Sequence, residues 1–143
     1  MSKEIFYTFS SKLSSSTIQA QPINLSDKED SLGLFDQHRL IQGFYDCISL
    51  PVIFKQEYGK KLEDVLDTGW AGLFLISKKL KDVLEENAFT GWKTFAVKLL
   101  DKNGSEIQDY FGLSITGRCG EIDYSKAEII EKRLVPNGPL GKY

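Results

Sequence analysis

The clearest alternation of apolar and polar positions lies between residues 93 and 116. The segments KTFAVKLLD (93–101) and EIQDYFGLSIT (106–116) flank KNGS, and Asn-Gly is the preferred pair for a two-residue type I′ turn. The pattern therefore predicts an antiparallel hairpin. Alternation along its second strand predicts one core face and one polar, exposed face. The predicted core side holds Phe111, Leu113 and Ile115, and the predicted polar side holds Tyr110, Gly112, Ser114 and Thr116.

Helical periodicity appears in two segments that share the sequence Leu-x-Asp-Val-Leu. Each is followed by Thr-Gly-Trp and an apolar run, so each predicts a helix, a left-handed glycine at its end and then a strand. These helices are predicted near residues 60–68 and 78–88. A weaker helical spacing covers residues 40–48, where Gly43 leaves a strand as the alternative.

Other segments complete the predicted fold. EIFYTF (4–9) and PVIFKQ (51–56) are rich in β-branched and aromatic residues, which favours strands. Residues 14–33 are polar and show no period of 2 or 3.6, so they are predicted to form a surface loop. Residues 1–143 are then one α+β domain: a mainly antiparallel sheet with a central hairpin and two or three helices packed on one face.

Composition and charge narrow the function classes. With 41% hydrophobic and 27% charged residues, the chain has the composition of an ordinary folded domain. A formal net charge of -2 argues against a nucleic-acid partner, because such domains are usually strongly basic. The sequence shows neither a secretion signal nor an apolar stretch long enough to span a membrane. These observations predict a cytoplasmic protein with no membrane partner.

The two cysteines are predicted to be free thiols. Cys47 and Cys119 stand far apart without the Cys or His spacing of a zinc site. The strand alternation, continued past residue 116, places Cys119 on the apolar side and predicts a buried thiol. Two alternatives stay open: a bulge at Gly117 and Gly120 would reverse the alternation, and Cys119 could pair with His38 as a nucleophile and its base.

No known catalytic or cofactor motif occurs. The sequence lacks GxGxxG, a phosphate loop, HExxH, GxSxG and a calcium loop, so no catalytic residue, metal ligand or cofactor is predicted. Lys78, Lys79 and Lys81 open the second predicted helix and fit either an anion site or an ordinary solvated surface. Trp70 and Trp92 fit either core packing or the anchoring of a partner.

Several of these elements resemble a known family. The apolar strand ending in Leu-Ile-Ser before a lysine-rich helix, the hairpin, and the Gly-Arg that closes its second strand are similar to the bacterial polymorphic-toxin immunity proteins of immunity family eleven. The runs that carry the similarity are LEDVL, GLFLISKKLKDVLEENAFTGWKTFAVKLLDKNG and DYFGLSITGRCGEIDYSKAEII, within about residues 51–138. The family pattern continues past NGPLGKY with a further strand and helix, so the resemblance implies a shortened member or a truncated chain.

The resemblance implies a function in binding rather than catalysis. Proteins of this family are inferred to bind and neutralise a toxin encoded beside them, so the expected partner is a cognate toxin protein. Two alternatives remain: an enzyme or small-ligand protein with an unrecognised pocket, and a structural module of a larger assembly. The sequence gives no prediction of the oligomeric state.

An inhibitor of this kind acts through exposed polar and aromatic side chains. Alternation along the hairpin nominates Tyr110, Ser114 and Arg118 as partner-binding residues, and a second group of acidic residues could steer a basic toxin. The alternative is that the polar side of the hairpin faces another element of the same domain. The acidic group consists of Asp27, Glu29 and Asp30.

Overall fold

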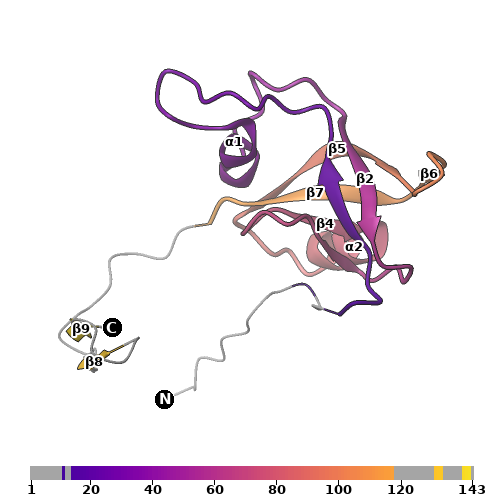
Figure 1. Cartoon of the computed structure of the whole chain (residues 1–143). Coiled ribbons are helices and arrows are strands. Elements are labelled where there is room, and N and C mark those ends of the chain that lie inside the picture. Colours follow the sequence, from indigo (N-terminus) through magenta and orange to yellow (C-terminus); the bar gives the residue numbers. More distant parts are fainter. Residues whose placement is uncertain (1–10, 12–13, 118–130, 134–139, 143) are drawn as a thin grey trace, which may run out of the picture.

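The computed structural model describes residues 11, 14–117, 131–133 and 140–142. Residues 14–117 contain seven strands and two short helices (Figure 1). The strands are β1 (Gln19–Pro22), β2 (Val52–Tyr58), β3 (Val65–Asp67), β4 (Phe74–Ser77), β5 (Trp92–Leu100), β6 (Glu106–Ile107) and β7 (Tyr110–Ile115), and the helices are α1 (Asp36–Gln42) and α2 (Lys78–Glu86). Separately, β8 (Glu131–Arg133) pairs with β9 (Leu140–Lys142) in a two-stranded antiparallel sheet.

Six of these strands close into a mixed β-barrel. Their order is β2-β1-β3-β4-β7-β5, and β5 pairs back with β2, while the short β6 is added to β5. The pairs β1–β3 and β2–β5 are parallel, and the remaining pairs are antiparallel. The predicted mainly antiparallel α+β sheet is therefore wrong. The parallel pair that closes the barrel joins Val52 to Val97, and local sequence patterns contain no signal for a contact over such a distance.

One hydrophobic cluster fills the barrel. Its largest members are completely inaccessible to solvent, and they come from α1 as well as from β2, β3, β4 and β5. Removal of this apolar surface from water is the main contribution to stability in a domain of this size. The cluster comprises Ile18, Ala20, Leu40, Ile48, Val52, Phe54, Leu66, Leu73, Leu75, Phe95 and Leu99.

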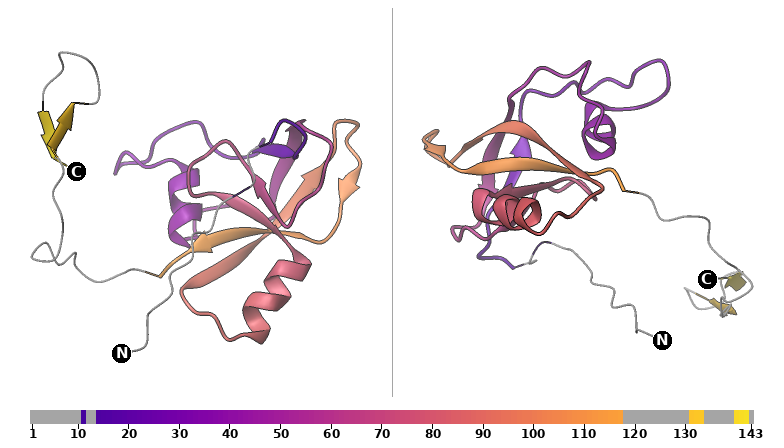
Figure 2. Two further views of the ribbon diagram at one scale, coloured as in Figure 1. Left: turned by 90° about the horizontal axis from the view of Figure 1, so that it is seen from below. Right: turned by 180° about the vertical axis from the view of Figure 1, so that it is seen from behind.

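The two helices lie on opposite sides of β7, as the views in Figure 2 show. On one side, α1 contributes Leu40 to the buried cluster, and its Leu40 carbonyl accepts a hydrogen bond from the Ser114 hydroxyl. On the other side, α2 contacts β4 and β7, and its Lys81 ammonium lies 4.8 Å from the centre of the Phe111 ring. The prediction of two or three helices packed on one face is therefore wrong as well.

Because both sides of β7 are covered, alternation along this strand does not separate core from solvent. Gly112 and Ser114, on the predicted polar side, are buried. Leu113, on the predicted core side, is also buried, whereas Ile115 is 43% exposed. The prediction of one core face and one exposed face on this strand is therefore wrong.

Two local predictions fail where tertiary pairing overrides propensity. Residues 60–68 do not form a helix; β3 occupies their end and pairs with β4 through Leu66 and Leu75. Residues 14–33 are not entirely a surface loop, because β1 lies within them and Ala20 is completely buried. A four-residue strand in a polar segment gives too short an alternation to be recognised.

Other local predictions agree with the structure. The helix predicted near residues 78–88 is α2, where the Ser77 hydroxyl caps the first turn by accepting a hydrogen bond from the Leu80 amide at 3.1 Å. Strand 51–56 corresponds to β2. The weaker helix predicted at 40–48 is only partly correct: α1 covers Asp36–Gln42, Gly43 caps its end with φ 81°, and residues 43–48 are not helical. The strand predicted at 4–9 lies outside the described residues.

The predicted hairpin is present, but its turn and second strand differ from the expectation. The second strand of the hairpin is divided into β6 and β7, and both parts pair with β5. The break between β6 and β7 contains Asp109, whose φ is 66°. In the turn, positive φ is confined to Gly104 (87°), so the turn is not type I′. The Asp101 carbonyl accepts a hydrogen bond from the Gly104 amide at 3.1 Å, as in hairpin loops that place a glycine after a type I turn.

We expect Gly104→Val to lower the free energy of unfolding by about 1–2 kcal/mol, the cost of a left-handed conformation for a residue with a side chain. A Cβ atom at this position would meet nothing within 4 Å, so the loss comes from the backbone alone. Gly104→Asn should lose less, because asparagine tolerates the left-handed region. Urea denaturation measures both variants, and equal stability of Gly104→Val and wild type would contradict the observed turn.

Candidate functional site

Of the two predicted partner-binding residues on β7, Ser114 lies inside the domain, whereas Tyr110 is half-buried and lines a hollow beside α2. Ser114 is completely buried, and its hydroxyl accepts a hydrogen bond from the Tyr45 hydroxyl at 2.7 Å while donating to the Leu40 carbonyl. Tyr110 is half-buried against the hydrophobic cluster, and its hydroxyl donates to the Glu63 carbonyl at 2.9 Å. The alternative interpretation, that this side of the hairpin faces the rest of the domain, describes both residues.

The surroundings of Tyr45 and Tyr110 raise the pKa of both phenols. Burial raises the pKa of the Tyr45 phenol, and the hydrogen bond to Ser114 offsets part of that effect. Burial, followed by the negative charges of Asp64 and Glu63, raises the pKa of the Tyr110 phenol. Both phenols therefore remain protonated at neutral pH and serve as hydrogen-bond donors.

The structure describes only one member of the Cys119–His38 pair considered for nucleophilic catalysis. Arg118 and Cys119 lie outside the described residues, so their predicted roles stay predictions. His38 lies in the first turn of α1, where its Nδ1 accepts a hydrogen bond from the Phe35 amide at 3.1 Å. Cys47 is a free, exposed thiol.

The acidic segment divides into two exposed side chains and one that organises the loop. Asp27 and Glu29 are exposed, and their role in binding a partner stays a prediction. The Asp30 carboxylate instead accepts hydrogen bonds from the backbone amides of Leu32 at 2.7 Å and Leu34 at 3.0 Å, and it forms an ion pair with Arg39. The three residues are therefore close together, but only two of them point into solvent.

The Asp30 contacts fix both the charge and the shape of the loop. The amide of Leu34, followed by the Arg39 side chain, lowers the pKa of the Asp30 carboxyl, so the group is ionised at neutral pH. Sequence analysis missed Leu32 and Arg39 as parts of this arrangement. The sequence DSLG at residues 30–33 could have indicated a β-turn, because Asp at the first position and Gly at the fourth favour one. In the structure the Gly33 amide donates a hydrogen bond to the Asp30 carbonyl at 3.0 Å.

The lysines at the start of α2 are each paired with a carboxylate. This pairing favours the solvated-surface interpretation over an anion site, since the positive charges are already compensated. The nitrogen–oxygen distances are 2.6 Å for Lys78–Asp82, 3.2 Å for Lys81–Glu85 and 3.7 Å for Lys79–Asp64.

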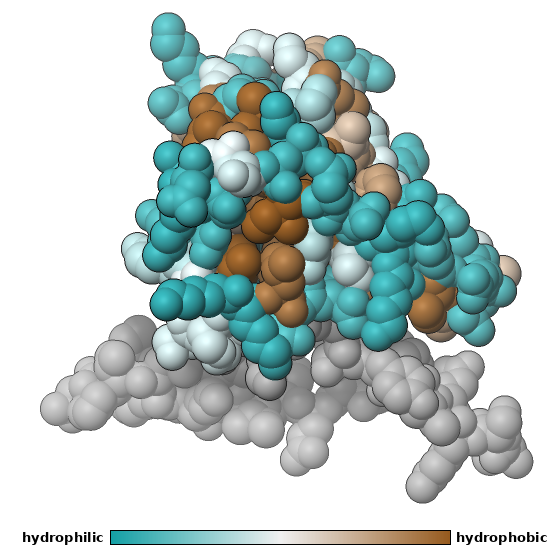
Figure 3. Space-filling model, turned by 90° about the vertical axis from the view of Figure 1, so that its right-hand side faces the viewer, coloured by the Kyte–Doolittle hydropathy of each residue, from teal (hydrophilic) through white to brown (hydrophobic). Residues whose placement is uncertain are grey.

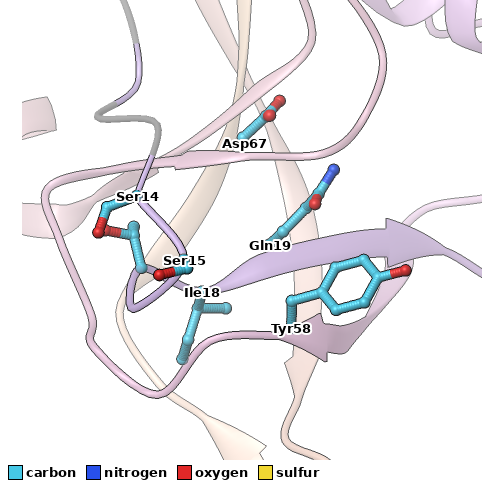
Figure 4. A pocket seen from close by; sticks show the side chains of 7 residues that line it. Ser14, Ser15, Ile18, Gln19, Tyr58 and Asp67 are labelled. Carbon is cyan, nitrogen blue, oxygen red and sulfur yellow. The ribbon is translucent and has the colours of Figure 1, made fainter.

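A hollow of about 230 Å³, with mixed polar and apolar walls, lies beside the first residues of β1. Figure 4 shows side chains from the loop before β1, from the end of β2 and from β3 around it. The carboxylate in its lining, Asp67, accepts a hydrogen bond from the Gly69 amide at 3.2 Å. The Ser14 hydroxyl bonds to the Ser16 hydroxyl at 2.8 Å, so the structure does not pair this hydroxyl with a base of the kind that activates a nucleophilic serine. Its lining comprises Ser14, Ser15, Thr17, Ile18, Gln19, Tyr58 and Asp67.

A second, apolar groove of about 170 Å³ lies between the C-terminal end of α2 and the end of β7. Phe89 and Ile115 on its walls are 59% and 43% exposed. Trp92 also lines the groove, but its indole nitrogen donates to the Phe89 carbonyl at 2.7 Å and its side chain is half-buried. Trp70, in turn, packs against Phe35 and the hydrophobic cluster, so both tryptophans have structural contacts.

Apolar side chains also reach the surface elsewhere in the described part of the chain. Figure 3 shows the side of the barrel that bears β6, where small groups of hydrophobic residues are bordered by hydrophilic ones. Within the described part of the chain, no cluster of three or more His, Cys, Asp or Glu side chains could hold a metal ion. Neither α1 nor α2 is long and apolar enough to cross a membrane.

These features describe a small β-barrel protein with exposed charged side chains on its loops and exposed apolar side chains along a surface groove. The sequence model of the immunity protein family Imm11 matches residues 6–138, and the chain therefore belongs to this family. The match confirms the family resemblance found in the sequence and supports a toxin-neutralising role in general. A search of curated proteins finds no match.

Proposed function

We propose that this protein binds and neutralises one cognate bacterial toxin and does so without catalysing a reaction. The observation that carries the proposal is the match of the immunity protein family to residues 6–138. A producing cell needs protection before a toxin leaves it, so the proposed encounter takes place in the cytoplasm.

The arrangement of the surface supports inhibition by contact. The exposed carboxylates Asp27 and Glu29 belong to a loop that Asp30 and Arg39 hold in shape, and an ordered charged loop can guide a partner of opposite charge. In the hollow next to β1, the described contacts of Ser14 and Asp67 form no pair of nucleophile and base, so they give little support to the enzyme alternative.

Co-expression tests the proposed function directly. The toxin encoded beside the gene of this protein should stop growth when expressed alone, and the wild-type protein should restore growth. The two purified proteins should also elute together in size-exclusion chromatography. If neither protection nor a complex is found with any product of an adjacent gene, the proposed function is wrong.

A further inference from the structure

The loop that follows β1 carries the most exposed large hydrophobic side chain in the described part of the chain. Leu32 is 76% exposed, compared with 60% for Phe44 and 59% for Phe89. Because it buries little surface in the folded domain, this leucine contributes little to folding. When a partner covers a large apolar side chain that was exposed to water, the free energy of the complex is lowered.

The turn that presents Leu32 is ordered before any partner binds. The Asp30 carboxylate holds the amides of Leu32 and Leu34, while the Asp30 amide donates to the Leu34 carbonyl at 2.9 Å. A loop already fixed in this way loses little conformational entropy when it binds, which is the usual advantage of a preorganised contact.

Two contacts connect this loop to the rest of the domain. The Asp30–Arg39 ion pair ties the turn to α1, and the Asp36 carboxylate of α1 accepts a hydrogen bond from the Ser26 amide at 2.9 Å. Since α1 is itself anchored in the barrel by the completely buried Leu40, the exposed leucine has a fixed position relative to the core.

The charges around the loop indicate the chemistry of the partner. Residues 23–50 contain five carboxylates and two cationic side chains, whereas the whole chain has nearly balanced totals of 20 and 18. Asp27 and Glu29 are exposed on the same loop as Leu32, and Asp46 is exposed in the segment after α1. A surface of this composition is complementary to a basic one.

We propose that Leu32 is an apolar anchor of the toxin-binding surface and that it enters a pocket with a basic rim on the toxin. Asp30 and Arg39 are positioning residues that hold the anchor, while Asp27 and Glu29 meet the basic rim. This inference rests on the proposed function, because it assigns a surface to the same toxin complex.

Binding kinetics of the purified toxin from the adjacent gene test the anchor. Leu32→Ala should raise the dissociation rate constant by about tenfold or more and leave the association rate constant nearly unchanged. Phe89→Ala is the matched control, because that side chain is also highly exposed but lies on the apolar groove by α2. Both variants should keep the wild-type melting temperature.

Charge reversal tests the basic rim. Asp27→Lys combined with Glu29→Lys should lower the association rate constant by about tenfold at low salt and weaken its salt dependence. Glu57→Lys combined with Glu86→Lys, at exposed acidic positions on β2 and α2, makes the same change in net charge and should have a much smaller effect.

The outcomes separate this inference from the proposed function. If wild type binds the toxin but Leu32→Ala dissociates at the wild-type rate, or Phe89→Ala alone accelerates dissociation, the anchor is misplaced and the proposed function stands. If reversal at Asp27 and Glu29 leaves association unchanged, the basic partner surface is wrong. If wild type forms no complex, the proposed function itself fails.

Discussion

Gly112→Ala is expected to destabilise the domain by about 3 kcal/mol or more, the upper range for overpacking a core. Gly112 on β7 lies opposite Phe95 on β5, and a Cβ atom there would fall 2.0 Å from the Phe95 ring. Strand propensity alone would make the substitution stabilising by about 0.5–1 kcal/mol. The sign of the change in the free energy of unfolding therefore shows whether the Phe95 ring occupies the space that the new Cβ atom would need.

Urea denaturation of matched variants isolates the contact. Gly104→Ala changes a glycine whose added Cβ atom would touch nothing, so it should lose only about 1 kcal/mol, the cost of positive φ. Phe95→Leu in the Gly112→Ala background should recover part of the loss, which would give a favourable coupling energy in a double-mutant cycle. A Gly112→Ala variant as stable as wild type would contradict the register of β5 and β7.

The sequence was informative wherever one local interaction determines the structure. The helical spacing of Leu80, Val83 and Leu84 predicted α2, and the Ser77 hydroxyl caps its first turn in the structure. The glycine at 104 adopts positive φ as expected, although the turn is not the predicted type. These features depend on residues that are close in sequence.

The sequence was misleading where distant strands decide the outcome. Leu62, Val65 and Leu66 have helical spacing, yet residues 65–67 pair with β4, and the gain from that pairing exceeds the weak helical preference. The closing contact between β2 and β5 is parallel, and its strands are separated by β3, β4 and α2. No periodicity within either strand encodes which partner it will meet.

The exposure of the predicted binding residues depends on what covers each element in the folded domain. Alternation assumes that one side of a strand faces water, but β7 has α1 on one side and α2 on the other, so Ser114 is buried. Asp27 and Glu29, by contrast, lie on a loop outside the barrel and are exposed as expected. Their place in a toxin complex remains a proposal.

Ser114→Val is expected to lower the free energy of unfolding by about 3 kcal/mol. The substitution removes the hydroxyl that joins Tyr45 to the Leu40 carbonyl, and each such hydrogen bond contributes about 0.5–1.5 kcal/mol. It also adds volume at a completely buried position, where overpacking costs about 1–3 kcal/mol. Thermal and urea denaturation measure the loss.

Two further variants distinguish a structural role for this serine from a binding role. Ser114→Ala loses the hydrogen bonds without adding volume and should cost about 1–2 kcal/mol, and Tyr45→Phe should cost about 1 kcal/mol. Their double mutant should lose less than the sum, because both remove the same bond. A Ser114→Val protein that kept wild-type stability but no longer protected cells from the toxin would place Ser114 at the partner surface and contradict its burial beneath α1.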